Sequence, residues 1–227
     1  MSALTVLIKA EPDAKARRAL VVASLAELRR AGTVRLEAAL AAAPRHSHNV
    51  VRGYAELTDR LVRLAFDIAT GVLHPLHNPT EGERLTVLAV GGYGRAEMAP
   101  QSDVDLLFLT PWKVTPWAES VIESMLYILW DLKLKVGHSS RTVKDCLRLG
   151  KADITIRTAL LEHRYLTGNI GLATELRDRL RNEVFRGTGP QFIEAKLAER
   201  AERHKRQGGQ RYVLEPNVKE GKGGLRD

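Results

Sequence analysis

Two aspartates separated by one residue, Asp103 and Asp105, are the residues of this chain best suited to do chemistry. They lead into an apolar run, Leu106 to Leu109, that is typical of a buried strand. Side chains i and i+2 of a strand point to the same face, so the two carboxylates are expected side by side. Adjacent carboxylates repel each other unless a cation lies between them, and hard oxygen ligands of this kind suit Mg²⁺. The pair therefore predicts a magnesium site, which Mn²⁺ can also occupy.

A glycine-rich turn lies upstream of the two aspartates. Gly91 and Gly92 follow an apolar run that predicts another buried strand, and Gly94 comes two residues later. Glycine allows a phosphate chain to approach the backbone closely, because no Cβ stands in the way. A phosphate-binding turn beside a metal-binding carboxylate pair is the equipment for phosphoryl or nucleotidyl transfer. The structural alternative is that the glycines form only a turn and the aspartates only a solvated strand start.

The sequence lacks two other common nucleotide-binding motifs. Residues 92–97 match a dinucleotide-binding G-x-G-x-x-G only in their first half, because Glu97 stands where the third glycine belongs. The sequence contains no G-x-x-x-x-G-K-[ST] phosphate loop.

Three side chains near the turn are candidates for contacting a nucleotide. Tyr93 is expected either to stack on a base or to pack in the core. Arg95 offers a planar fork suited to phosphate oxygens, although pairing with Glu97 is an equal alternative. Ser102 has a hydroxyl that can reach a phosphate.

Composition limits the class of protein. Hydrophobic residues make up 44% and charged residues 27% of the 227 residues, as in a soluble globular protein. The net charge of +8 raises the question of nucleic acid, but the basic residues are scattered and aromatic residues, at 5%, offer no interleaved stacking surface. A nucleoside triphosphate or an acidic protein partner accounts for the charge equally well. The sequence therefore argues against nucleic-acid binding.

Location follows from the single cysteine and from hydropathy. Cys146 rules out an internal disulfide framework and fits a reducing compartment. No run approaches the roughly 18 apolar residues that a membrane span needs. We expect a cytoplasmic protein that makes no use of a membrane.

The pattern of apolar residues predicts an α+β fold. A helical N-terminal region (1–75) is expected to precede a core (76–150), followed by a helical region (151–227) that begins a further domain. The core is predicted to be a small mixed sheet with a crossing helix, flanked by N- and C-terminal helices. Strands are predicted at 84–91, 103–110 and 134–141, and helices at 14–43, 50–69, 116–131, 142–149, 153–163, 170–185 and 190–206.

The glycine pair, the spacer and the Asp-x-Asp resemble the signature of the DNA polymerase β-like nucleotidyltransferase superfamily. Within it, GGYGRAEMAPQSDVDLLFL is similar to the bacterial PII-protein uridylyltransferase family. The resemblance covers roughly residues 84 to 227. Three segments support it: LWDLKLKVGHSSRTVKDC (129–146), DITIRTALLEHRYLTG (153–168) and YVLEPNVKEGKGGLRD (212–227). The last segment also resembles the related glutamine-synthetase adenylyltransferases, which are the second candidate.

The resemblance implies a reaction. The triphosphate of UTP is expected over Gly91 to Gly94, with Mg²⁺ held by Asp103 and Asp105. A tyrosine hydroxyl of a PII signalling protein then attacks the α-phosphorus, and pyrophosphate leaves. The preference for UTP over ATP rests on the resemblance alone.

The superfamily usually supplies a third carboxylate from a neighbouring strand, but residues 134–141 contain no acid. Asp153 is the best candidate to serve as a metal ligand instead, with a helix N-cap before Ile154 as the alternative. On the same predicted strand, His138 and Arg141 are expected to face the triphosphate, with a structural hydrogen bond as the alternative.

In the family that the chain resembles, uridylyl removal and glutamine sensing belong to domains further along the chain. The sequence ends within KEGKGGLRD and is expected to be the catalytic front end, without either activity. The alternative class is a truncated, non-catalytic module that binds a nucleotide or a partner.

Overall fold

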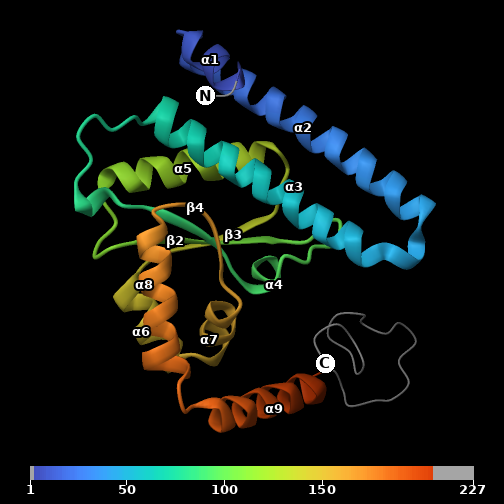
Figure 1. Cartoon of the computed structure of the whole chain (residues 1–227), viewed down its shortest axis with the longest axis vertical. Coiled ribbons are helices and arrows are strands. Elements are labelled where there is room, and N and C mark those ends of the chain that lie inside the picture. The colour runs from blue at the N-terminus through green and yellow to red at the C-terminus, as the bar shows by residue number, and fades with distance from the viewer. Residues whose placement is uncertain (1–2, 207–227) are drawn as a thin grey trace.

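A computed structural model describes residues 3–206, so the predicted segment 212–227 lies outside the described residues. The fold is α+β, as predicted: a four-stranded sheet is covered by helices on both faces (Figure 1). No helix in the described part of the chain is long and apolar enough to cross a membrane.

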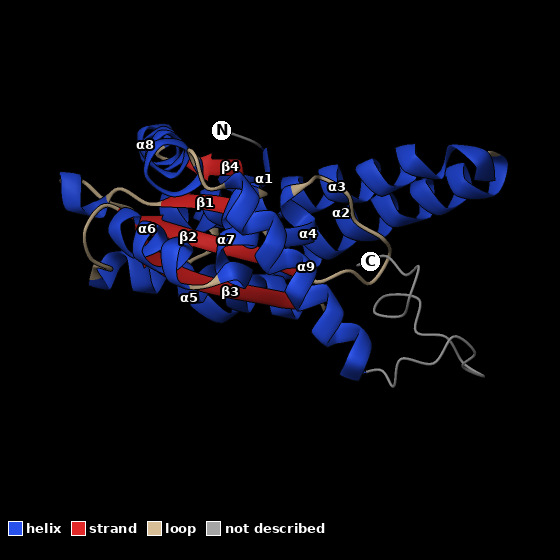
Figure 2. Cartoon of the chain, turned by 90° about the horizontal axis from the view of Figure 1, so that it is seen from below, coloured by secondary structure: helices blue, strands red, loops and turns tan. Residues whose placement is uncertain are grey.

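The strands are β1 (Thr86–Ala89), β2 (Val104–Thr110), β3 (Val136–Thr142) and β4 (Arg164–Gly168). Their order in the sheet is β3-β2-β1-β4, which Figure 2 shows from one edge to the other. β1 runs antiparallel to both β2 and β4, whereas β2 and β3 are parallel and are joined by the crossing helix α5 (Pro116–Asp131). Three strands were predicted. β4 was not, and it lies within the region 151–227 that was expected to be helical.

Each helix that was predicted from the sequence has a counterpart in the structure. Thr115 caps α5 by accepting from the Ala118 amide, and Pro116 occupies the first turn, as expected for a helix start. The other helices are α1 (Ala3–Ala10), α2 (Ala14–Ala42), α3 (Ser47–Ile68), α4 (Gly91–Gly94), α6 (Val143–Ala152), α7 (Ile154–Leu161), α8 (Ile170–Leu180) and α9 (Gly189–Arg206). Short 3₁₀ or π turns lie at Pro44–His46, Ala69–Leu73, Glu81–Glu83 and Arg181–Phe185.

Alternation along β2 divides the core into two layers. Leu106 and Phe108 belong to the cluster formed with α3 and α5, whereas Leu107 and Leu109 belong to the cluster formed with α6 and α8. Figure 1 shows α3 and α5 on one side of the sheet and α6 and α8 on the other. Cys146 lies in the second cluster, and burial raises the pKa of its thiol to about 12. The Asp105 position continues the odd-numbered series of β2, so it lies on the α6–α8 side of the sheet.

Candidate active site

Asp105 lies on β2 between two glycines of neighbouring elements. Its register partner on the parallel strand β3 is Gly137, and a Cβ built there would lie 2.6 Å from Asp105 Oδ1. A Cβ on Gly91, which begins α4, would lie 3.3 Å from Asp105 Oδ2. Gly91 also has φ +58°, a conformation that side chains other than glycine rarely adopt. The carboxylate therefore occupies space that exists because both neighbours lack side chains.

The glycine turn is the single helical turn α4, which follows directly from β1. The Val90 amide that precedes it donates to the Asp105 carbonyl oxygen at 3.1 Å, so the turn and the start of β2 are joined by backbone. A Cβ on Gly94 would lie 1.8 Å from the carbonyl oxygen of Glu162, so only glycine allows the turn to pack against the end of α7. A Cβ on Gly92 would make only an ordinary contact, 3.6 Å from Arg95 Nη2. Gly94 is thus structural, whereas the Gly92 backbone has space beside it.

Asp103 lies exposed immediately before β2, and Asp105 is half-buried. Val104 between them is fully buried, so alternation directs the two carboxylates away from the core that holds Val104. Among residues 3–206 no group of three or more His, Cys, Asp or Glu side chains is arranged to hold a metal. Two neighbouring carboxylates fit Mg²⁺, which commonly takes one or two protein carboxylates and completes its shell with phosphates and water.

The structure gives Asp153 the capping role. Its Oδ1 accepts from the amides of Thr155 (2.7 Å) and Ile156 (2.9 Å) at the start of α7. The alternative reading of this residue is therefore the observed one, and no three-residue metal cluster of the described chain contains it. A third carboxylate at position 137 is excluded by the closeness of Asp105.

Tyr93 is a residue of the core. Its side chain is 1% exposed, and its hydroxyl donates to Asp59 Oδ1 at 2.8 Å. Burial raises the pKa of this hydroxyl far above its ordinary value, and the charge of Asp59 adds to the effect. Of the two alternatives for Tyr93, packing in the core is therefore the observed one.

Arg95 and Ser102 have partners of their own. Arg95 Nη1 pairs with Glu162 Oε1 at 2.7 Å, not with Glu97, and about half of the Arg95 side chain stays exposed. Ser102 Oγ accepts from the Ala99 amide at 3.0 Å within the loop before Asp103. Contact of either residue with a phosphate stays a prediction.

His138 and Arg141 lie on opposite faces of β3. His138 makes edge contacts with Phe108 (6.5 Å between ring centroids) and Trp130 (6.4 Å), on the α5 side of the sheet. Arg141 pairs in register with Leu109 and shares the Asp105 face. The expectation that both residues face the triphosphate was wrong for His138. His138 and Arg141 are three positions apart, and an odd spacing along a strand places two side chains on opposite faces of the sheet.

A buried ionic network holds the glycine turn in place, and the sequence analysis missed it. Asp59 of α3 is 6% exposed and binds Arg164 of β4 through both oxygens, at 2.6 and 3.0 Å. Arg164 also donates to the carbonyl oxygens of Tyr93 (3.2 Å) and Gly94 (3.3 Å). Burial lowers the pKa of Arg164, but its pairing with Asp59 outweighs this and the net shift is upward. The network ties α3, α4 and β4 together around the turn.

No local sequence signal indicates this network. Asp59 lies 34 positions from Tyr93 and 105 from Arg164. The visible hint is that Asp59 falls on the apolar face of the amphipathic helix α3, with Ala55 and Val62, since a buried acid needs a partner.

Models of two protein families match separate parts of the chain. A family model described as GlnD PII-uridylyltransferase matches residues 191–227, and one described as Glutamate-ammonia ligase adenylyltransferase matches residues 2–131. The similarity therefore includes the first 80 residues, in which no motif was recognised from sequence.

Curated relatives decide between the two families. Proteins named bifunctional uridylyltransferase/uridylyl-removing enzyme are 67% identical in Cereibacter sphaeroides, over 99% of this chain, and 60% identical in Ruegeria pomeroyi, over 95%. A third, from Erythrobacter litoralis, is 54% identical over 96%. The chain spans about a quarter of the length of these relatives (25%, 24% and 24%). With this identity over nearly its whole length, the chain belongs to the family of bifunctional uridylyltransferase/uridylyl-removing enzymes.

Proposed function

We propose that this chain is a nucleotidyltransferase module that transfers UMP from UTP to a tyrosine hydroxyl of a PII signalling protein. The relatives' name supports uridylyl transfer, and the family model at 191–227 carries PII in its description. The observation that carries the proposal is the placement of Asp105, whose carboxylate lies between Gly91 and Gly137 and next to the exposed Asp103.

Each part of the site has a role in this proposal. The backbone of Gly91 and Gly92 receives the triphosphate, because no side chain blocks the approach. Asp103 and Asp105 hold Mg²⁺, which when bound neutralises charge on the phosphates and aligns attack and departure. The Asp59–Arg164 pair keeps the turn rigid, so that the phosphate-binding backbone and the carboxylates hold one geometry.

A transfer assay tests the proposal. The chain is incubated with UTP labelled at the α-phosphate, Mg²⁺ and PII protein, and label on PII is measured. We expect label with wild-type protein and none with Asp105→Asn. A PII variant whose acceptor tyrosine is replaced by phenylalanine is the matched control for the acceptor. Tight binding of UTP without label on PII would instead favour a non-catalytic module.

Adenylyl transfer is the second candidate, favoured by the adenylyltransferase model that matches residues 2–131. The same assay with labelled ATP and glutamine synthetase decides between the two. Label on glutamine synthetase from ATP, with none on PII from UTP, would establish the adenylyltransferase reading.

A further inference from the structure

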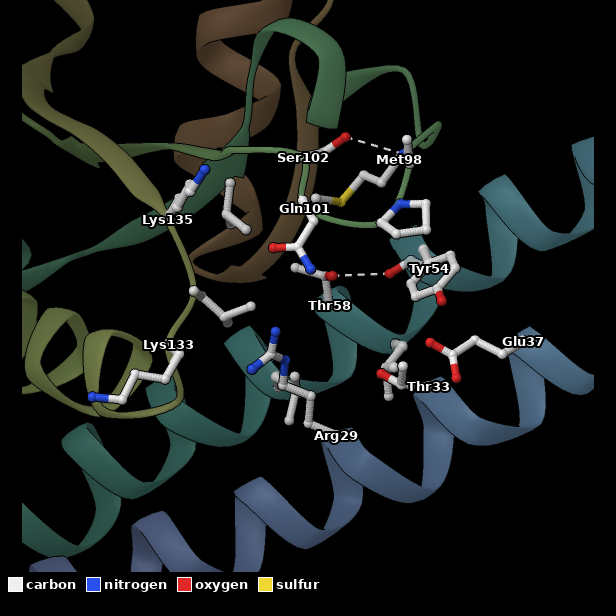
Figure 3. A pocket seen from close by; sticks show the side chains of 16 residues that line it. Arg29, Thr33, Glu37, Tyr54, Thr58, Met98, Gln101, Ser102, Lys133 and Lys135 are labelled. Atoms are coloured by element: carbon white, nitrogen blue, oxygen red, sulfur yellow. Dashed lines mark hydrogen bonds between the residues drawn. The ribbon is translucent and has the colours of Figure 1, made fainter.

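A cavity of about 100 Å³ lies behind the loop that leads to Asp103. Its walls come from α2, α3, the loop before β2 and the turn before β3 (Figure 3). Val104 lines it, and Val104 belongs to the core cluster on the α3 and α5 side of the sheet. The cavity is therefore separate from the carboxylate site, although its wall of residues 98–102 ends directly at Asp103.

The cavity is lined by three cations: Arg29, Lys133 and Lys135. None of them forms an ion pair with a carboxylate within residues 3–206. Arg29 Nη1 donates to the carbonyl oxygen of Leu132 at 2.5 Å, and this partner is neutral. Glu37, which lies on the same helix α2 as Arg29, is the acid of the lining, so by count the lining carries an excess of positive charge. An excess of uncompensated cations around a cavity favours an anionic occupant.

Two of the lining residues lie in turns with a left-handed backbone conformation. Gln101 has φ +70° and Lys133 has φ +59°, in the region that residues other than glycine rarely adopt. Figure 3 shows the Gln101 and Arg29 side chains pointing into the same space from opposite sides, with Lys133 and Lys135 extending outward at one side. Both conformations belong to turns: the Leu134 amide donates to the Leu129 carbonyl oxygen at the end of α5, and the Ser102 amide donates to the Ala99 carbonyl oxygen in the loop before β2.

We propose that this cavity binds a small oxyanion, a carboxylate or a phosphate group, between Arg29 and Gln101. One water molecule needs roughly 10–15 Å³ of cavity volume, so a cavity of about 100 Å³ has room for roughly seven to ten water-sized positions. The guanidinium of Arg29 has donors left for two anion oxygens, and the Gln101 amide supplies a further donor. The proposal is independent of the transfer reaction, because it concerns the opposite face of the sheet.

Titration of the ¹⁵N-labelled chain followed by NMR tests the site. Succinate and inorganic phosphate are the two probes, and chloride at matched ionic strength is the reference for simple screening. We expect saturable shifts of the amides at 98–104 and 132–135 with one or both probes. In Arg29→Gln the affinity should fall about tenfold or more, because a charged hydrogen-bond donor is lost.

Arg30→Gln is the matched control, because Arg30 is the next residue of α2 and pairs with Glu27 at the surface. It removes the same charge outside the cavity and should leave the affinity unchanged. If Arg29→Gln does not fold, Gln101→Gly, which removes the other donor of the proposed site and suits the positive φ there, should still weaken binding.

Three results would overturn the proposal. These are the absence of saturable shifts with either probe, equal affinities in the wild type and the folded cavity variant, and shifts confined to the glycine turn at 91–94. The last result would assign anion binding to the nucleotide site alone.

Discussion

The carboxylate of Asp105 fills the position where a side chain on Gly137 would begin. The two residues are register partners on parallel strands, and a Cβ on residue 137 would lie 2.6 Å from Asp105 Oδ1. Real Cβ atoms essentially never approach a neighbour this closely, so an alanine at 137 must displace the carboxylate. The placement of the main candidate ligand thus depends on a glycine of another strand.

Gly137→Ala should therefore lower transfer activity about tenfold or more with the fold intact, because the metal-binding carboxylate shifts by a fraction of an ångström. Initial rates with saturating UTP, together with a thermal unfolding curve, measure both effects. Ser140→Ala is the matched control, because Ser140 lies on the same strand but on the opposite face. Activity of Gly137→Ala equal to that of the control would show that the position of Asp105 is not critical.

Gly92 and Gly94 should respond differently to substitution. Gly94→Ala should destabilise the fold by about 1–3 kcal/mol or more, because its Cβ would lie 1.8 Å from a backbone oxygen. Gly92→Val should leave folding largely intact but weaken UTP binding, because the valine side chain covers the backbone that receives phosphate. Chemical denaturation and UTP titration separate the two effects. Undiminished UTP affinity in folded Gly92→Val would mean that the turn has only a structural role.

The Asp59–Arg164 pair should be important for stability. Asp59→Ala leaves the guanidinium of Arg164 without its carboxylate. Breaking a fully buried pair in this way costs about 3–5 kcal/mol, and the 27% exposure of the Arg164 side chain should bring the loss to the lower end of this range. Tyr93→Phe removes a single hydrogen bond and should cost only about 1–2 kcal/mol, because Asp59 keeps both bonds to Arg164. Urea denaturation of the two variants gives the comparison. Equal and small losses would show that the network contributes little.

How far the sequence predicted this fold depends on how local each signal is. Strands β1 and β2, the turn between them and helix α5 have apolar runs, glycines and a Pro start within a few residues, and they were predicted. β4 is five residues long and has no alternating pattern, and it becomes a strand by pairing with β1 about 80 positions earlier. The burial of Tyr93 likewise depends on Asp59 of α3, which no local window includes.

The same distinction holds for the site. Asp103 and Asp105 were found because their spacing in a strand is itself the signal. For Asp153 the sequence allows both a cap and a metal ligand, because both roles use the same residue type, and the structure shows the cap. From the sequence, position 137 was notable only because residues 134–141 contain no acid that could serve as the third carboxylate. Its closeness to Asp105, however, depends on the parallel register of β2 and β3.

Tyr93 should stay neutral through alkaline pH in the folded chain, since burial raises its pKa. In the unfolded chain a tyrosine ionises near pH 10, so the stability that neutral Tyr93 provides is present below about pH 10 and is lost as the pH rises further. Phenolate absorbance measures this. The native titration near pH 10 should have the same amplitude in the wild type and in Tyr93→Phe, whereas the denatured proteins should differ by one tyrosine. A smaller native amplitude in Tyr93→Phe would contradict the buried placement.

The central claim is that Asp103 and Asp105 hold a metal ion together with the nucleotide. The most direct measurement is calorimetric titration of Mn²⁺ into the chain with and without UTP, for the wild type, Asp103→Asn and Asp105→Asn. We predict weak binding without UTP and much tighter binding with it, because phosphate oxygens complete the shell. In each variant, Mn²⁺ should bind the chain with UTP no more tightly than it binds UTP alone. The unfolding temperature of each variant should stay the same or rise, since the repulsion between the two carboxylates is relieved. Metal affinity with UTP that is unchanged in folded Asp105→Asn would contradict the account.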